Sequence, residues 1–149
     1  MWVSSAKKKQ VTLNRAMGRI INQTFSYGHE VEADGQRSES RNRRNLPCLV
    51  FRTDEQDAGV AGITLDMSLQ GLSFYSSKPL EPGAYLIIVR SNQETLALKG
   101  ECLHCQAQPL GAYYSGFALT EVMEPKDNED LFQAIESYDA ERIAVRSKQ

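Results

Sequence analysis

Histidine and recognisable catalytic motifs are both scarce in this chain of 149 residues. Only two histidines are present, and no Gly-x-Ser-x-Gly, Gly-x-x-x-x-Gly-Lys or His-Glu-x-x-His motif occurs. These are the patterns that place a nucleophile, a phosphate-binding loop or a zinc pair. Asp66 and Ser68 lie close in sequence, but they lack the intervening imidazole of a catalytic triad. The sequence therefore predicts a protein that is not an enzyme.

Cysteine is equally sparse, with three residues in the whole chain. Three cysteines, an odd number, do not form a disulfide framework in a chain of this size. Their scarcity agrees with a reducing compartment. Cys102 and Cys105 flank His104 like half of a zinc site, but in a strand pattern residues three apart face opposite sides. Four ligands would need Cys48 or His29, and neither has a paired spacing. We expect core cysteines, a histidine at the rim, and no metal or other cofactor.

Long apolar runs are missing as well. The densest run, from Ala84 to Val89, has the length of a strand, whereas a membrane span needs roughly 18 apolar residues. The first nine residues place their charges after a very short apolar start and lack the hydrophobic region of a signal peptide. We therefore expect no transmembrane segment and a cytoplasmic location.

Charge is distributed unevenly along the chain. Residues 1 to 46 contain nine Lys or Arg and four Asp or Glu, a net charge of +5. Residues 47 to 149 contain eight and fifteen, a net charge of −7. A basic arm on an acidic body indicates that anions bind to the arm. Nucleic acid is not an expected partner, because the acidic body would repel its phosphate backbone.

The basic arm begins with an expected amphipathic helix over residues 6 to about 25. Leu13, Met17, Ile20 and Ile21 are spaced like one face of a helix. This face could cover its own domain or a sister subunit, or it could dock a protein partner. Residues 26 to 45 follow without apolar periodicity, and their composition indicates a loop or mobile linker.

Short strand patterns then recur, with turn residues between them. We expect strands at about 48 to 52, 58 to 66, 71 to 76, 84 to 90, 94 to 105 and 112 to 121. Six strands joined by hairpin-length turns indicate a mainly β protein, either an antiparallel barrel or a sandwich. After Pro125, residues 126 to 146 read as a helix with an acidic first turn and a basic end. Leu131, Ile135 and Tyr138 form its expected buried stripe.

A first polar cluster lies within the linker. It is Arg37-Ser-Glu-Ser-Arg41, closely followed by Arg43 and Arg44. Guanidinium groups offer paired donors to phosphate oxygens or to guanine O6 and N7. The cluster therefore indicates a phosphorylated or guanine-bearing ligand.

A second polar cluster is Asp66-Met-Ser68-Leu-Gln-Gly71, set between two apolar runs. Asp66 and Ser68 project from one face of an expected strand. The carboxylate can accept from the ring N–H and amino group of guanine, and the hydroxyl can donate to phosphate or base. Each residue also has an alternative, purely structural role. Asp66 could form an ion pair, Ser68 could cap the backbone and Gly71 could form a turn.

Together, Arg-x-x-x-Arg before a strand and Asp-x-Ser-x-x-Gly at a strand end resemble the two-part signature of PilZ domains, the bacterial receptors for cyclic di-GMP. Further landmarks agree with the resemblance, which covers about residues 36 to 145. They are Leu46-Pro47-Cys48, Pro82-Gly83 and Tyr114-Ser-Gly116-Phe117. The resemblance selects a barrel over a sandwich.

The resemblance implies a six-stranded antiparallel PilZ-type β-barrel with a C-terminal α-helix, preceded here by the N-terminal amphipathic helix. Residues 1–35 would be the N-terminal helix and linker, and residues 36–149 the PilZ domain. Within that domain we expect a ligand-gripping loop at 36–46, the barrel at 47–124 and the C-terminal helix at 126–146.

The resemblance also implies roles for the two clusters. Arg37 and Arg41 would grip phosphates and guanine edges, with Arg43 and Arg44 as possible secondary contacts. In the second cluster, Asp66 and Ser68 would read the base, and Gly71 would let the backbone turn close to the ligand.

The expected function is that of a cyclic di-GMP receptor or adaptor whose conformation or partner contacts change on binding. A protein partner or self-association through the N-terminal helix is expected to carry the output. Gln36 stands where many family members have another arginine, so whether one nucleotide or a stacked pair binds stays open. The alternative is a ligand-independent PilZ-like module for protein–protein interaction.

Overall fold

The computed structural model describes residues 5–23, 41–53 and 59–136 of the chain. Its elements are α1 (Ser5–Gln23), β1 (Asn42–Arg43), β2 (Pro47–Arg52), β3 (Val60–Met67), β4 (Gly71–Ser76), β5 (Gly83–Arg90), β6 (Thr95–Ala107), η1 (Pro109–Gly111), β7 (Tyr113–Met123), η2 (Pro125–Asp127) and α2 (Glu129–Glu136). The six strands expected from the sequence are β2 to β7, and each observed end lies within two residues of its prediction.

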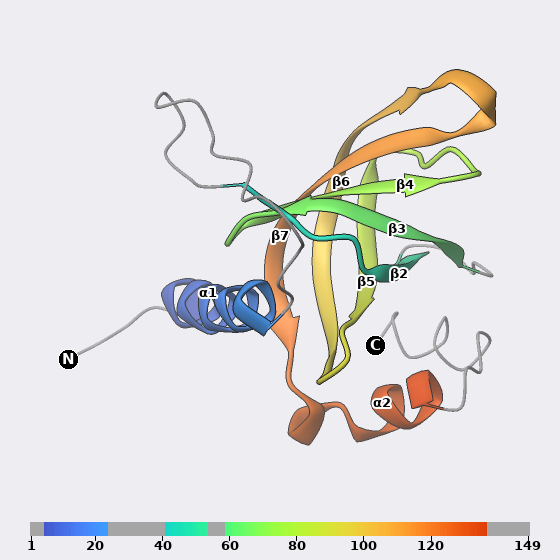
Figure 1. Cartoon of the computed structure of the whole chain (residues 1–149). Coiled ribbons are helices and arrows are strands. Elements are labelled where there is room, and N and C mark those ends of the chain that lie inside the picture. The colour runs from blue at the N-terminus through green and yellow to red at the C-terminus, as the bar shows by residue number, and fades with distance from the viewer. Residues whose placement is uncertain (1–4, 24–40, 54–58, 137–149) are drawn as a thin grey trace.

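These six strands close into an antiparallel barrel (Figure 1). The strand order is β1-β3-β2-β5-β6-β7-β4, and an additional pairing between β3 and β4 completes the ring. The two-residue strand β1 adds to the outer side of β3. The prediction of a mainly β, six-stranded antiparallel barrel is confirmed.

Strand β5 explains the densest apolar run of the sequence. Tyr85, Ile87 and Val89 point into the barrel core. Leu86 and Ile88 point outward into a second core that α2 covers. Because both faces of this strand are buried, its pattern is continuous rather than alternating. Two hydrophobic cores therefore share one sheet, one inside the barrel and one beneath α2.

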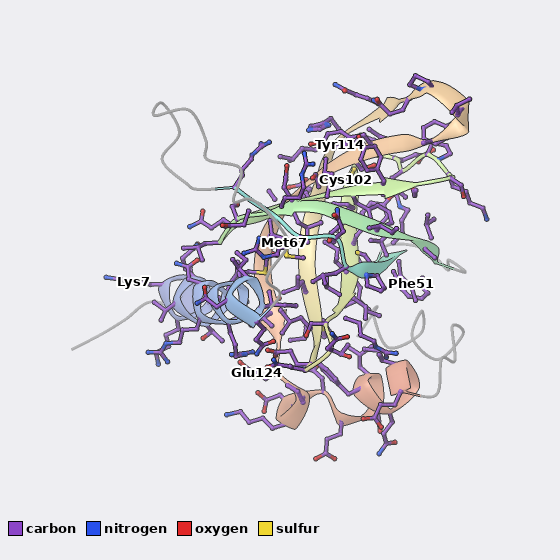
Figure 2. The ribbon with its side chains drawn as sticks, viewed as in Figure 1. Lys7, Phe51, Met67, Cys102, Tyr114 and Glu124 are labelled. Atoms are coloured by element: carbon purple, nitrogen blue, oxygen red, sulfur yellow. The ribbon has the colours of Figure 1, made fainter. Side chains whose placement is uncertain are left out.

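Helix α1 packs against β7 and adds its apolar stripe to the barrel core. Leu13, Met17 and Ile20 are each at most 1% exposed, in the same core as Met67 of β3 (Figure 2). The prediction of an amphipathic helix that covers its own domain is confirmed. A partner that uses this helix must therefore contact its polar face or displace it.

The polar side of α1 is tied to the turn between β5 and β6. Arg19 donates from Nε and Nη2 to the two carboxylate oxygens of Glu94, at 2.8 and 2.9 Å. Gln23 donates to the same carboxylate at 2.8 Å. The Arg19 hydrogen bond is the main reason that the pKa of Glu94 is lowered and that the pKa of Arg19 is raised.

The C-terminal helix begins later than residue 126. Pro125 opens a short 3-10 turn, and Asn128 leaves helical geometry at φ −141° and ψ 46°. The amide of its side chain donates to the Glu124 carbonyl at 2.9 Å, so the α-helix starts only at Glu129. Leu131 and Ile135 are buried as predicted. Tyr138 and the rest of the predicted helix beyond Glu136 lie outside the described residues.

The prediction of a loop up to Asn45 is wrong at its end. Residues 42 and 43 form β1, and Thr64 of β3 holds the next residues in place. The Thr64 hydroxyl donates to the Arg44 carbonyl at 2.6 Å and accepts from the Leu46 amide at 2.9 Å. Because these bonds come from one threonine on a distant strand, the polar composition of the segment gave no sign of them.

Neither described helix offers a stretch that is long and apolar enough to cross a membrane.

Candidate functional site

A β-bulge in β3 places Asp66 on the outer surface of the barrel. Thr64 and Met67 both point inward and are fully buried, although they are three residues apart. The extra residue between them breaks the strand alternation and leaves Asp66 on the outside. The Ser73 hydroxyl of β4 donates to Asp66 Oδ1 at 2.9 Å and accepts from the Asp66 amide at 3.2 Å. The carboxylate is therefore held in one orientation before any ligand arrives.

The second oxygen of this carboxylate faces the first polar cluster. Arg41 Nη1 lies 3.8 Å from Asp66 Oδ2, and 45% of the Arg41 side chain is exposed. The pairing of Arg43 with Asp66 between β1 and β3 brings this arginine segment alongside the carboxylate. A pair of this length and exposure contributes little to stability. The guanidinium can therefore turn to an anionic ligand at small cost.

The residues after Asp66 form a tight turn into β4. The Ser68 amide donates to the Gly71 carbonyl at 2.9 Å. The Ser68 hydroxyl lies 3.5 Å from the same carbonyl, a weak contact that leaves it available to a ligand. A β-carbon at Gly71 would lie 3.1 Å from the Phe117 carbonyl oxygen of β7. Gly71 thus lets β4 and β7 lie close together at this point, a packing role that differs from the turn expected from the sequence.

The remaining arginines of the first cluster are placed differently. Arg37 lies outside the described residues. Arg43 is exposed on β1. Arg44 is only 4% exposed, and its guanidinium donates to the Ile21 carbonyl at 3.1 Å and to the Arg43 carbonyl at 2.8 Å. This burial does not support the expected ligand contact at Arg44, and we assign it a structural role at the end of α1.

The motif residues line a shallow hollow that continues across β7 and β6. Its volume is about 140 Å³. The residues that line it are Arg41, Asp66, Ser68, Gly71, Leu72, Ser73, Leu103, His104, Tyr114, Gly116 and Phe117. Sequence reasoning brought together Arg41, Asp66, Ser68 and Gly71, and the structure places them in one site. It missed the contribution of Ser73, His104 and Tyr114.

Arg41 and Asp66 are the only Lys, Arg, Asp or Glu residues among the described residues that line the hollow. The hollow is smaller than the roughly 300–1,000 Å³ of pockets that enclose drug-sized ligands. The hollow can therefore hold one base or one phosphate of a ligand. A larger ligand would need further contacts from outside these residues.

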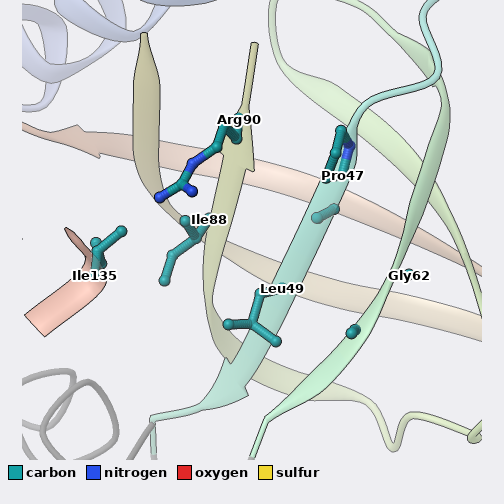
Figure 3. A pocket seen from close by; sticks show the side chains of 8 residues that line it. Pro47, Leu49, Gly62, Ile88, Arg90 and Ile135 are labelled. Carbon is teal, nitrogen blue, oxygen red and sulfur yellow. The ribbon is translucent and has the colours of Figure 1, made fainter. Parts of the chain in front are cut away.

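A larger cavity of about 280 Å³ lies between the outer wall of the barrel and α2 (Figure 3). Its lining residues are Pro47, Cys48, Leu49, Ala61, Gly62, Ile88, Arg90 and Ile135. Arg90 is the one charged side chain among them. A polar nucleotide would find few partners in this cavity, so the smaller hollow is the better candidate site.

The cysteines do not gather around a metal. Among the residues that the structure describes, no three His, Cys, Asp or Glu side chains lie close enough to hold a metal ion. Cys48 and Cys102 are buried, and burial raises the pKa of both thiols. A raised pKa keeps the thiols protonated and unreactive at neutral pH.

Comparisons with known proteins identify one matching family model. The family model described as PilZ domain matches residues 35–137. The comparison with curated proteins found no match. Among solved structures, the Bacillus subtilis inhibitor of motility (MotI/DgrA) is similar, with a TM-score of 0.49 and 12% identity over 70% of this chain and 52% of that chain. The present chain thus spans about half the length of that structure.

Proposed function

Because the chain belongs to the PilZ domain family, we propose that it is a receptor for cyclic di-GMP. PilZ domains generally act as receptors or adaptors rather than enzymes. The nucleotide would bind on the outer surface of the barrel, over the hollow that Asp66 and Ser68 line. Its binding would then change the contacts of the N-terminal part of the chain.

The position of Arg41 beside Asp66 is the observation that carries this proposal. The two residues are 25 positions apart in the sequence and belong to different halves of the family signature. Their side chains lie 3.8 Å apart across the edge of the hollow. A cation and a carboxylate side by side match a ligand that has both phosphates and the donor edge of guanine.

Each motif residue has a separate task in this proposal. Arg41, together with Arg37, would bind phosphate oxygens and guanine acceptors. Asp66 would accept from the ring N–H and amino group of guanine, with Ser73 fixing the orientation of its carboxylate. Ser68 would donate its hydroxyl to phosphate or base. Arg43, which is exposed on β1, is retained as a possible secondary contact.

The output would pass through α1, because both halves of the site contact this helix. Arg44, three residues after Arg41, donates to the Ile21 carbonyl in the last turn of α1. Leu69, in the turn between Ser68 and Gly71, lies near Gly18 of α1, where an added β-carbon would be 3.9 Å from Leu69 Cδ2. Movement of either half on binding would therefore change how α1 is held, and with it what a partner meets.

Calorimetry with cyclic di-GMP tests the proposal through Arg41→Ala. The substitution removes at least one hydrogen bond to a charged group, and one such bond contributes about 1.5–3 kcal/mol. This corresponds to a loss of affinity on the order of tenfold to a hundredfold. Lys126→Ala is the control, because it removes one exposed positive charge next to η2 without touching the hollow. Equal affinities for Arg41→Ala and the parent protein would overturn the assignment of Arg41.

The alternative, a ligand-independent interaction module, is favoured by apolar side chains on the β6–β7 hairpin. Leu103 is 59% exposed, and Leu110 at the hairpin tip is fully exposed. Leu110 also adopts a positive φ of 66°, which is unusual for leucine. Thermal unfolding separates the two functions, since cyclic di-GMP stabilises the protein only if the native state binds it.

A further inference from the structure

The strands β6 and β7 bring two aromatic rings to the edge of the hollow. The rings of His104 and Tyr114 stack with their centroids 6.1 Å apart and an interplanar angle of 26°. Tyr75 of β4 supports Tyr114 from the other side in an edge-on contact, with centroids 5.3 Å apart. None of these rings belongs to the two motifs of the family signature, and both His104 and Tyr114 line the hollow.

A second β-bulge turns His104 toward this site. Cys102 pairs with Phe117 and His104 pairs with Gly116, so Leu103 is an extra residue in β6. Without it, the strict alternation of a strand would send His104 into the barrel on the side of Cys102, which is 1% exposed. Bulges that re-aim a side chain next to a site are features that a fold retains for a purpose.

Gly116 provides the space in which the imidazole lies. A β-carbon at this position would lie 2.5 Å from His104 Nε2 and 2.8 Å from His104 Cε1. Any other residue at Gly116 would therefore push the ring away from the sheet. The absence of a side chain here lets the imidazole cover β7 and reach the hollow.

Asp66 and His104 lie at opposite ends of one row of paired residues across the sheet. Ser73 bonds to Asp66 and pairs with Gly116, and Gly116 pairs with His104. Three strand spacings separate the outer members of this row, about 14 Å between their backbones. Both side chains line the hollow of about 140 Å³, which suits one planar base.

We propose that His104 and Tyr114 form a stacking wall for one purine base of the bound nucleotide, an inference that rests on the proposed function. The base stacks on the aromatic wall while its donor edge faces Asp66. The wall is rigid before binding, because Gly116 seats one ring and Tyr75 supports the other. A preformed surface of this kind loses little side-chain entropy on binding.

Four variants measured by calorimetry with cyclic di-GMP test this role. His104→Ala should weaken binding about tenfold, as expected when one base loses its aromatic partner. His104→Phe keeps a planar ring and should bind nearly as well as the parent protein. His104→Gln keeps a hydrogen-bond donor without the ring and should bind like His104→Ala. Tyr114→Ala should also weaken binding.

Gly116→Ala provides an independent test that leaves both rings in the chain. Its β-carbon displaces the imidazole, so it should weaken binding in the parent protein. It should add little in a His104→Ala background, where the displaced group is already missing. Circular dichroism and the melting temperature of each variant report whether the barrel is intact.

The outcomes distinguish this inference from the function on which it rests. If the parent protein binds and Arg41→Ala weakens binding, but His104→Ala and Tyr114→Ala bind like the parent, only the stacking wall is overturned. The stacking wall would also be overturned if His104→Gln bound cyclic di-GMP as tightly as the parent protein and His104→Phe bound it weakly. The histidine would then act as a hydrogen-bond donor. If the parent protein does not bind cyclic di-GMP, both the function and the stacking wall are overturned.

Discussion

Replacing the buried Arg44 by methionine should detach the C-terminal end of α1 from the barrel. The last four carbonyls of a helix have no partner within it, and the Ile21 carbonyl is one of these. The Arg44 guanidinium donates to it at 3.1 Å and places a positive charge at the negative end of the helix dipole. Methionine keeps an unbranched side chain and removes the charge and the donors.

The expected loss of stability follows from the bonds that disappear. A hydrogen bond to a charged group contributes about 1.5–3 kcal/mol, and a buried acceptor left without a partner costs about 1–3 kcal/mol. The Arg43 carbonyl belongs to an exposed residue and can accept a hydrogen bond from water instead. We therefore count the free energy of the Ile21 hydrogen bond in full and that of the Arg43 hydrogen bond in part. The result is a destabilisation of about 2–3 kcal/mol, or roughly 4–10 °C in melting temperature for a chain of this length.

Two measurements check this expectation against Arg43→Met, a matched change at the neighbouring exposed position. Thermal unfolding should show the drop for Arg44→Met and a change within about 0.5 kcal/mol for Arg43→Met. Amide exchange should rise in α1 for Arg44→Met while the strands of the barrel keep their protection. Equal melting temperatures for the two variants, with unchanged exchange in α1, would refute the capping role of Arg44.

Two further predictions concern carboxylates. Because the pKa of Glu94 is lowered in the folded state by its hydrogen bond from Arg19, its stabilising contribution is present above the unfolded pKa of about 4.3 and is lost as pH falls through the folded value. Glu94→Gln should therefore cost about 0.5–1 kcal/mol at pH 7, as a partly exposed pair does, and the difference from the parent protein in urea unfolding should shrink as the pH falls below about 4.3. A gap that persists at low pH would contradict this reasoning. Asp66→Ala should narrow the preference for cyclic di-GMP over cyclic di-AMP, because adenine has no ring N–H to donate to the carboxylate; calorimetry with both nucleotides gives the ratio, and an unchanged ratio counts against base reading by Asp66.

The six strands were predictable because they carry strong local signals, whereas the choice of a barrel over a sandwich came from the family resemblance. Alternating or continuous apolar runs end at turn residues, and β5 is the clearest case, with Ala84 to Val89 at its centre. The same holds for the apolar stripe of α1, whose members Leu13, Met17 and Ile20 are all buried. In each segment, local preference and tertiary packing favour the same structure.

The parts that the sequence did not reveal depend on distant contacts. A β-bulge adds one residue without a signature of its own, so the outward turn of His104 after Leu103 could not be read from the spacing. Arginine is rarely buried, and in a polar segment Arg44 looks like another ligand contact. The end of α1, 23 positions away, gives its guanidinium an acceptor that the local sequence does not reveal. Gly116 was recognised as a landmark of the family in the sequence, but its role depends on the His104 ring that lies over it.

Leu69 places the turn between Ser68 and Gly71 next to α1 at Gly18. Docking of α1 and the proposed binding of the nucleotide would then both involve the turn between Ser68 and Gly71. Two equilibria coupled in this way affect each other equally. If binding of the nucleotide changes the docking equilibrium of α1 by a certain factor, docking of α1 changes the affinity for the nucleotide by the same factor. Under the proposed function, substitutions along α1 that never touch the ligand would therefore change the concentration of cyclic di-GMP at which the protein responds.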